Sequence, residues 1–226
     1  MRRLAGTTAI ALGIVYLAIG VVFFLLPEGQ QAGGASALLE SLAEDGTVIY
    51  LGWQWLFVLS GALGIAVVGG VARSFGDDRE GGVRWASVVG YLGFGLTIVD
   101  GLGSIAFVYQ DAHRFYADAD EVLRTVIAGD LMASSVAPQG WATFGLIGAW
   151  IATVSVLALG DRTMLRGPAV LGVPVAIGYV LVPLGNATGV TAIITLAAVL
   201  AIVLAPAFYL WAGVLLRRDT PEVSRR

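Results

Sequence analysis

The sequence predicts an all-α polytopic membrane protein with six transmembrane helices, both termini in the cytoplasm, and short amphipathic helices in the two outer loops. Of its 226 residues, 58% are hydrophobic and 13% are charged, and the mean hydropathy is +0.85. The chain is therefore far more apolar than a soluble domain. Apolar runs long enough to cross a bilayer occur six times. The arginines gather in alternate loops, which predicts the orientation.

The predicted spans form one bundle over residues 1–226. The first span follows Met1-Arg2-Arg3 and has the layout of a secretory signal, but its apolar run is too long for one. We therefore expect an uncleaved first helix. Tryptophans begin the second and fourth spans, as is typical of interfacial anchors. The spans cover residues 4–26, 51–71, 85–109, 141–159, 168–184 and 190–216, and the outer loops cover residues 27–50 and 110–139.

Prolines predict irregular backbone in the last two spans. Pro174 and Pro183 fall inside the fifth span, which we expect to be bent or partly unwound. A tight uncharged turn is expected over Gly185–Gly189. In the sixth span Pro206 frees the carbonyl of Ile202, which predicts a kink.

Each outer loop is expected to contain a short helix. In the first loop, Ser36–Ala43 places leucines on one face, which we expect to lie on the membrane surface. In the second loop, Asp118 followed by Glu121 is typical of a helix start. The acidic residues of these loops indicate a solvated surface rather than a divalent-cation site. Their spacing does not match the calcium-binding loop, and His113 is the only histidine.

The distribution of arginine predicts the topology. With both termini inside, only Arg114 and Arg124 face outward, as the positive-inside rule requires. The outer loops then carry nine acidic side chains, a surface that concentrates cations and repels anions. We expect a multi-pass protein of the cell (plasma) membrane. The eleven arginines expected on the cytoplasmic side are Arg2, Arg3, Arg73, Arg79, Arg84, Arg162, Arg166, Arg217, Arg218, Arg225 and Arg226.

Two missing residue types restrict the chemistry. Without cysteine the chain has no disulfide, thiolate nucleophile or iron–sulfur cluster, and without lysine it has no Schiff base and no P-loop lysine. Arginine as the only strong base, together with abundant Ala, Gly and Val, is typical of GC-rich prokaryotic genomes.

Intramembrane enzyme chemistry is not expected. An aspartyl protease needs two carboxylates in the spans, and a rhomboid-type serine protease needs a histidine there; the spans supply neither set. No metal-ligand set, haem ligand or phosphate-binding loop is found either. We therefore expect a non-enzymatic protein with no catalytic residue, no metal and no cofactor.

Asp100 is the one carboxylate within the predicted spans. It lies about 5 Å from the midpoint of the third span, too deep for its short side chain to reach the headgroups. A charge at that depth costs about 2.5–3.5 kcal/mol, so Asp100 is expected to face the bundle interior. Thr97 stands three residues before it and Ser104 four residues after it, so both share its helix face, and we place Gly93 and Gly101 in the same stripe.

Two interpretations of Asp100 remain open. It is either a proton- or ion-coupling carboxylate or a buried polar group that joins helices by hydrogen bonds. Thr97 and Ser104 offer hydroxyls on its own helix. Tyr16 and Tyr179 lie at about the right depth to donate a hydrogen bond to it.

Small residues predict where helices pack closely. In the second span they recur at four-residue spacing, as in tightly packed membrane helices. Gly93 and Gly101, eight residues apart, are the small residues expected to pack closely beside Asp100. The second-span positions are Ser60 with Gly64, and Ala62 with Ala66 and Gly70.

Two functions are compatible with these features. The favoured one is a structural or accessory subunit that packs against partner helices or lipid, with Asp100 as a packing contact. The alternative is a small proton- or cation-coupled transporter that uses Asp100, in which the six spans divide into two inverted halves. The expected partners are the lipid bilayer and a membrane-protein partner or a second copy of the chain; no nucleic acid is expected.

The layout of the latter half resembles that of small six-span prokaryotic membrane proteins of unknown function. The resemblance rests on the Trp141–Leu159 span, the short arginine-containing turn after it, and the Gly- and Pro-bearing stretch Arg166–Tyr179. It implies a helical bundle and assigns no functional residue.

Overall fold

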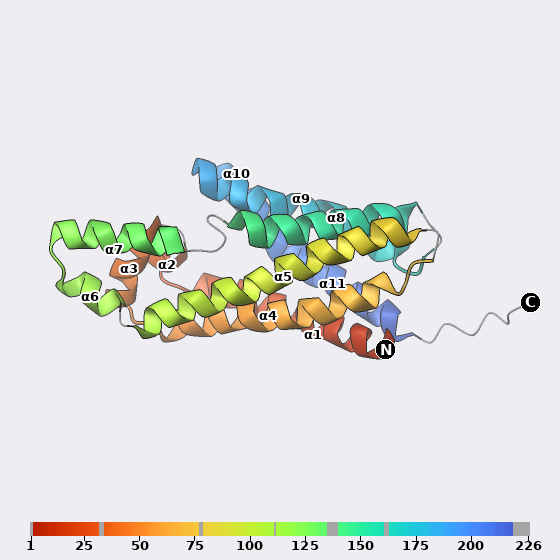
Figure 1. The fold of residues 1–226 in the computed structure, drawn as a ribbon, viewed down its shortest axis with the longest axis horizontal. Helices are drawn as coiled ribbons and strands as arrows, with labels where there is room; N and C mark the ends of the chain where they lie inside the picture. Colours follow the sequence, from red (N-terminus) through yellow and green to blue (C-terminus); the bar gives the residue numbers. More distant parts are fainter. Residues whose placement is uncertain are drawn as a thin grey trace, which may run out of the picture.

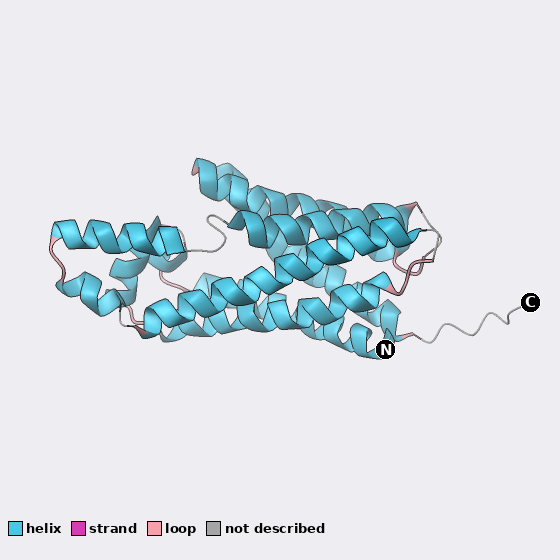
Figure 2. Ribbon diagram, in the orientation of Figure 1, coloured by secondary structure: helices cyan, strands magenta, loops and turns pink. Residues whose placement is uncertain are grey.

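The computed structural model describes residues 2–31, 34–76, 79–110, 112–134, 140–160 and 163–218, and the regular structure in these ranges is entirely helical (Figures 1 and 2). Six of the helices are long and apolar enough to cross a membrane, which confirms the predicted number. They are α1 (Arg2–Leu25), α4 (Val48–Ala72), α5 (Glu80–Tyr109), a π-helical turn (Trp141–Gly145) continued by α8 (Leu146–Leu159), α9 (Arg166–Thr188), and α10 (Thr191–Val199) continued by a second π-helical turn (Leu200–Leu204) and α11 (Ala205–Arg217).

The six helices form a closed ring. Each packs on the next along the chain, from α1 to α4, α5, α8 and α9, and α11 packs on both α9 and α1. The start of α1 and the end of α11 lie at the same end of the bundle (Figure 1). Large side chains fill its centre. The largest fully buried ones are Trp150, Tyr179, Tyr209 and Phe94.

The prolines disturb the helices less than expected. Helix α9 continues through Pro174 and Pro183 to Thr188, so the expected unwinding is wrong and the expected turn is reduced to Gly189, whose φ is +67°. Neighbouring helices pack along α9 and stabilise it despite the missing N–H groups. In the last span, the carbonyl left free by Pro206 lies in the π-helical turn Leu200–Leu204, one of the known ways in which a helix accommodates such a break.

Four short helices form a cap at the end of the bundle opposite the termini (Figure 1). They are α2 (Glu28–Gln31), α3 (Gly34–Glu44), α6 (Ala112–Asp118) and α7 (Glu121–Ser134).

We expected the apolar face of α3 to lie on the membrane surface. Instead, other parts of the protein cover it. Leu39 is fully buried with Tyr116 of α6 and Ala128 of α7, and Leu42 is buried against Tyr50. The start of α7 also differs by a residue or two from the expected pattern. Asp120, rather than Asp118, caps it by accepting a 2.8 Å hydrogen bond from the Leu123 N–H.

Replacing Leu39 by alanine is expected to loosen the cap and leave the ring of long helices intact. A buried leucine truncated to alanine costs about 2–5 kcal/mol, and the Leu39 side chain packs on α6 and α7. Amide hydrogen exchange in α6 and α7 should accelerate, while exchange in α1 and α11 stays unchanged. The matched control is Val122→Ala, because Val122 is 75% exposed. Equal protection of the cap in both variants would contradict the packing described here.

Candidate functional site

Asp100 borders a pocket between α4, α5 and the π-helical turn that is lined by both polar and aromatic side chains. The pocket has a volume of about 150 Å³. The carboxylate is half-buried and lies in the half of the bundle nearer the cap. The lining residues are Trp53, Gln54 and Phe57 from α4, Thr97, Asp100, Gly101 and Ser104 from α5, and Thr143 and Phe144 from the π-helical turn.

Helix α5 contributes to the pocket through the stripe read from the sequence. Thr97, Asp100, Gly101 and Ser104 all line it. The hydroxyl of Thr97 donates a 2.9 Å hydrogen bond to the carbonyl of Gly93, so it is satisfied within its own helix. The stripe therefore brings one carboxylate and two hydroxyl side chains to one side of the pocket.

Two glycines of this stripe set the distance to the neighbouring helices. A Cβ atom at Gly101 would lie 2.9 Å from Val58 Cγ2 and 3.4 Å from the carbonyl oxygen of Gln54. A Cβ atom at Gly93 would lie 2.9 Å from the backbone nitrogen of Ile147. The first glycine lets α4 approach Asp100, and the second lets α8 approach α5.

The π-helical turn supplies the third side. Gly140 precedes it with φ +86°, a left-handed conformation that glycine adopts without strain. The turn then carries Thr143, which is buried, and Phe144 into the pocket. The hydroxyl of Thr143 donates a 3.3 Å hydrogen bond to the Gly140 carbonyl. Short π-helical segments of this kind occur frequently at functional sites.

Tyr50 is a buried tyrosine beside the pocket: its side chain lies near those of Gln54 and Ser104 and within electrostatic range of Asp100. Sequence reasoning did not select Tyr50, Gln54 or Thr143. The sequence does contain one signal for these residues. Gln54 is an amide within an apolar span, four residues after Tyr50, and a buried amide needs polar partners.

Tyr16 and Tyr179 form a separate cluster and do not line the pocket. The hydroxyl of Tyr16 is in hydrogen-bonding contact with Tyr179 and Ser60. The ring of Tyr16 stacks on that of Tyr209 at 5.4 Å between centroids and meets that of Tyr179 edge-on at 6.4 Å. The Ser60 hydroxyl donates a 2.8 Å hydrogen bond to the Phe57 carbonyl, which connects this cluster to a residue of the pocket.

An aromatic wall, made of Trp53, Phe57 and Phe144, runs along the pocket. Trp53 and Phe57 pack edge to face with centroids 4.9 Å apart and planes at 85°. Phe57 and Phe144 do the same at 6.4 Å and 83°. The indole nitrogen of Trp53 is buried and has no hydrogen-bond partner among the described residues.

The small residues predicted in α4 fall into two groups. Ser60, Gly64 and Gly70 are buried, with Gly64 against the ring of Phe94 and Gly70 against Ala5. Ala62 and Ala66 are exposed on the outer face of the bundle.

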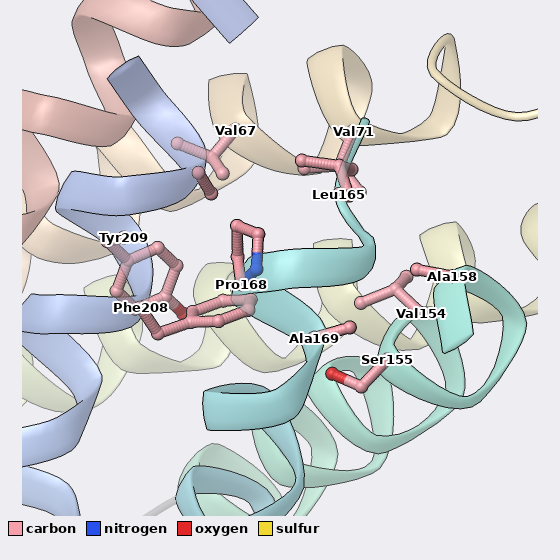
Figure 3. Close-up of a pocket in the computed structure, with 11 residues that line it drawn as sticks. Val67, Val71, Val154, Ser155, Ala158, Leu165, Pro168, Ala169, Phe208 and Tyr209 are labelled. Atoms are coloured by element: carbon pink, nitrogen blue, oxygen red, sulfur yellow. The ribbon is translucent and has the colours of Figure 1, made fainter. Parts of the chain in front are cut away.

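A second, smaller cavity lies between α4, α8, α9 and α11 (Figure 3). Its volume is about 20 Å³, enough for a single water molecule. Ser155 and Tyr209 both line it, and their hydroxyls have no hydrogen-bond partner within the described ranges.

Comparison with known proteins adds no assignment: no protein-family model, curated protein or solved structure matches the chain. Within the described ranges, no group of three or more His, Cys, Asp or Glu side chains is placed to hold a metal ion. Six helices of this length and hydropathy are compatible with a multi-pass integral membrane protein.

Proposed function

We propose that this protein is a small proton- or cation-coupled transporter in which Asp100 is the coupling carboxylate. The supporting observation is the pocket that places Asp100 beside Gln54, Ser104 and Thr143, with room for several waters or a small ion. Ionisable residues in membrane spans are expensive and mark ion or substrate pathways more often than other buried residues do. A side chain that served only to join two packed helices would not need an open space of this size beside it.

The transporter is proposed to lie in the cell membrane of a prokaryote with both termini in the cytoplasm. Arginines at the end of the bundle that holds the termini support this orientation, among them Arg73, Arg79, Arg166 and Arg217. The cap at the opposite end would then face outward. It carries an acidic surface that would raise the local concentration of cations near the pocket. The acidic residues of the described cap are Glu28, Glu40, Glu44, Asp45, Asp118, Asp120, Glu121 and Asp130.

A role without catalysis is part of the proposal. The only intramembrane carboxylate has no second carboxylate in the sequence of the spans with which to share a proton, and the single histidine lies in the cap.

A second candidate is an accessory subunit that packs against a membrane-protein partner or another copy of the chain. The exposed pair Ala62 and Ala66 favours it, because small side chains four residues apart let a second helix approach closely. This function does not require Asp100 to exchange protons with water. A titration of Asp100 therefore distinguishes the accessory subunit from the transporter.

The test is the titration of Asp100 by difference infrared spectroscopy on the full chain in liposomes. We expect a carboxyl band that titrates near neutral pH in the wild type and is absent in Asp100→Asn. The amide of asparagine retains hydrogen-bonding capacity, so the fold should persist. Asp130→Asn, in the cap, is the matched control and should keep the band. A band showing that the carboxyl group stays protonated at every pH tested would overturn the transporter proposal and favour the accessory subunit.

A further inference from the structure

The pocket combines two chemically different features. Its lining includes the acidic residue Asp100 and the three aromatic residues Trp53, Phe57 and Phe144. A hydrated inorganic ion or a proton gains little from contact with aromatic rings. An organic cation gains more, because its charge pairs with a carboxylate while its alkyl groups contact the rings by cation–π attraction and apolar contact.

The arrangement of the rings suits such a ligand. Adjacent rings of the aromatic wall are nearly perpendicular, at 85° and 83°, so they do not stack on one another. In each pair the edge of one ring meets the face of the other, so neighbouring rings of the wall are turned in different directions along the pocket.

The size of the pocket limits the ligand. A cavity of about 150 Å³ lined by apolar side chains holds a molecule as large as benzene, and this pocket has the same volume. Tetramethylammonium or a small alkylamine fits this limit. Larger lipophilic cations would require the helices to move apart.

The polar groups of the pocket do not form a metal site. Within the described ranges, no group of three or more His, Cys, Asp or Glu side chains is placed to hold a metal ion. The pocket offers a single carboxylate, which does not balance the double charge of calcium or magnesium. One negative charge matches a singly charged cation.

We propose that the pocket binds a small organic ammonium ion, with the Asp100 carboxylate as its counter-ion and Trp53, Phe57 and Phe144 as its aromatic wall. This inference rests on the proposed function, since it names the substrate class of the same site.

The test is isothermal titration of the full-length protein in nanodiscs with tetramethylammonium. We expect saturable binding to the wild type and none of the uncharged analogue neopentanol. Asp100→Asn should weaken binding by at least about tenfold, and Phe144→Leu by about 3- to 30-fold, the range of one cation–π contact. Phe115→Leu is the matched control, because Phe115 is 66% exposed on α6 in the cap and does not line the pocket. It should bind as the wild type does.

Two outcomes would overturn the inference. One is the absence of tetramethylammonium binding while Asp100 still titrates near neutral pH, which would leave a proton- or inorganic-ion-coupled transporter in place. The other is binding that Asp100→Asn and Phe144→Leu leave unchanged, which would put the ion elsewhere. Loss of both the titration and the binding would remove the proposed function as well. A Trp53→Leu variant provides a second aromatic substitution if Phe144→Leu fails to fold.

Discussion

Replacing Gly213 by alanine is expected to destabilise the protein by about 3 kcal/mol or more, the upper range for overpacking. A Cβ atom at this position on α11 would lie 2.8 Å from the carbonyl oxygen of Gly6 and 2.8 Å from the backbone nitrogen of Ile10, both on α1. At Gly6, a Cβ atom would lie 2.7 Å from the Gly213 carbonyl oxygen. No side-chain rotation relieves a contact with backbone, so the two helices would have to separate.

Gly103→Ala is the matched control for Gly213→Ala. Gly103 lies on α5, and a Cβ atom there would meet nothing within 4 Å. Unfolding by detergent titration, followed by circular dichroism, should show a lower midpoint for Gly213→Ala and an unchanged one for Gly103→Ala. Equal midpoints would contradict the close backbone contact between α1 and α11 described here.

Replacing Gly64 by alanine is expected to have an effect of comparable size through a side chain. A Cβ atom at Gly64 would overlap the ring of Phe94, which is fully buried and packs edge to face on Trp150 with centroids 5.7 Å apart. The ring has no free space to enter, so the cost is about 1–3 kcal/mol or more.

A double-mutant cycle isolates that contact. Phe94→Leu alone should destabilise by leaving a cavity, whereas the Gly64→Ala, Phe94→Leu pair should be less destabilised than the sum of the single variants. Gly95→Ala serves as control because a Cβ atom there would meet nothing within 4 Å. Strictly additive effects in detergent unfolding would contradict the close fit between α4 and α5.

The number of long helices and the face presented by Asp100 could be read from the sequence. Hydropathy alone specifies helices of sufficient length, because every backbone group in lipid must be satisfied within its own segment. Helical periodicity likewise placed Thr97 and Ser104 beside Asp100, since residues three and four apart share a face.

The rest of the candidate site depends on which helices are neighbours, and local sequence does not encode that. Depth in the membrane placed Tyr16 and Tyr179 level with Asp100 but could not show that both lie in another cluster. Gln54 and Thr143 reach the pocket only because α4 and the π-helical turn flank α5. Likewise, the closest backbone approach of the terminal helices, at Gly6 and Gly213, joins residues at opposite ends of the chain.

The closed ring has a consequence for how the chain can be connected. Because α1 packs directly on α11 and both terminal ends lie at the same end of the bundle, a short linker could join them. New ends could then be opened in the connection between α4 and α5 or between α8 and α9, which lie at that same end. Every helix would keep its direction and both neighbours in such a circular permutant. The ring is thus specified by pairwise helix contacts rather than by the place where the polypeptide starts.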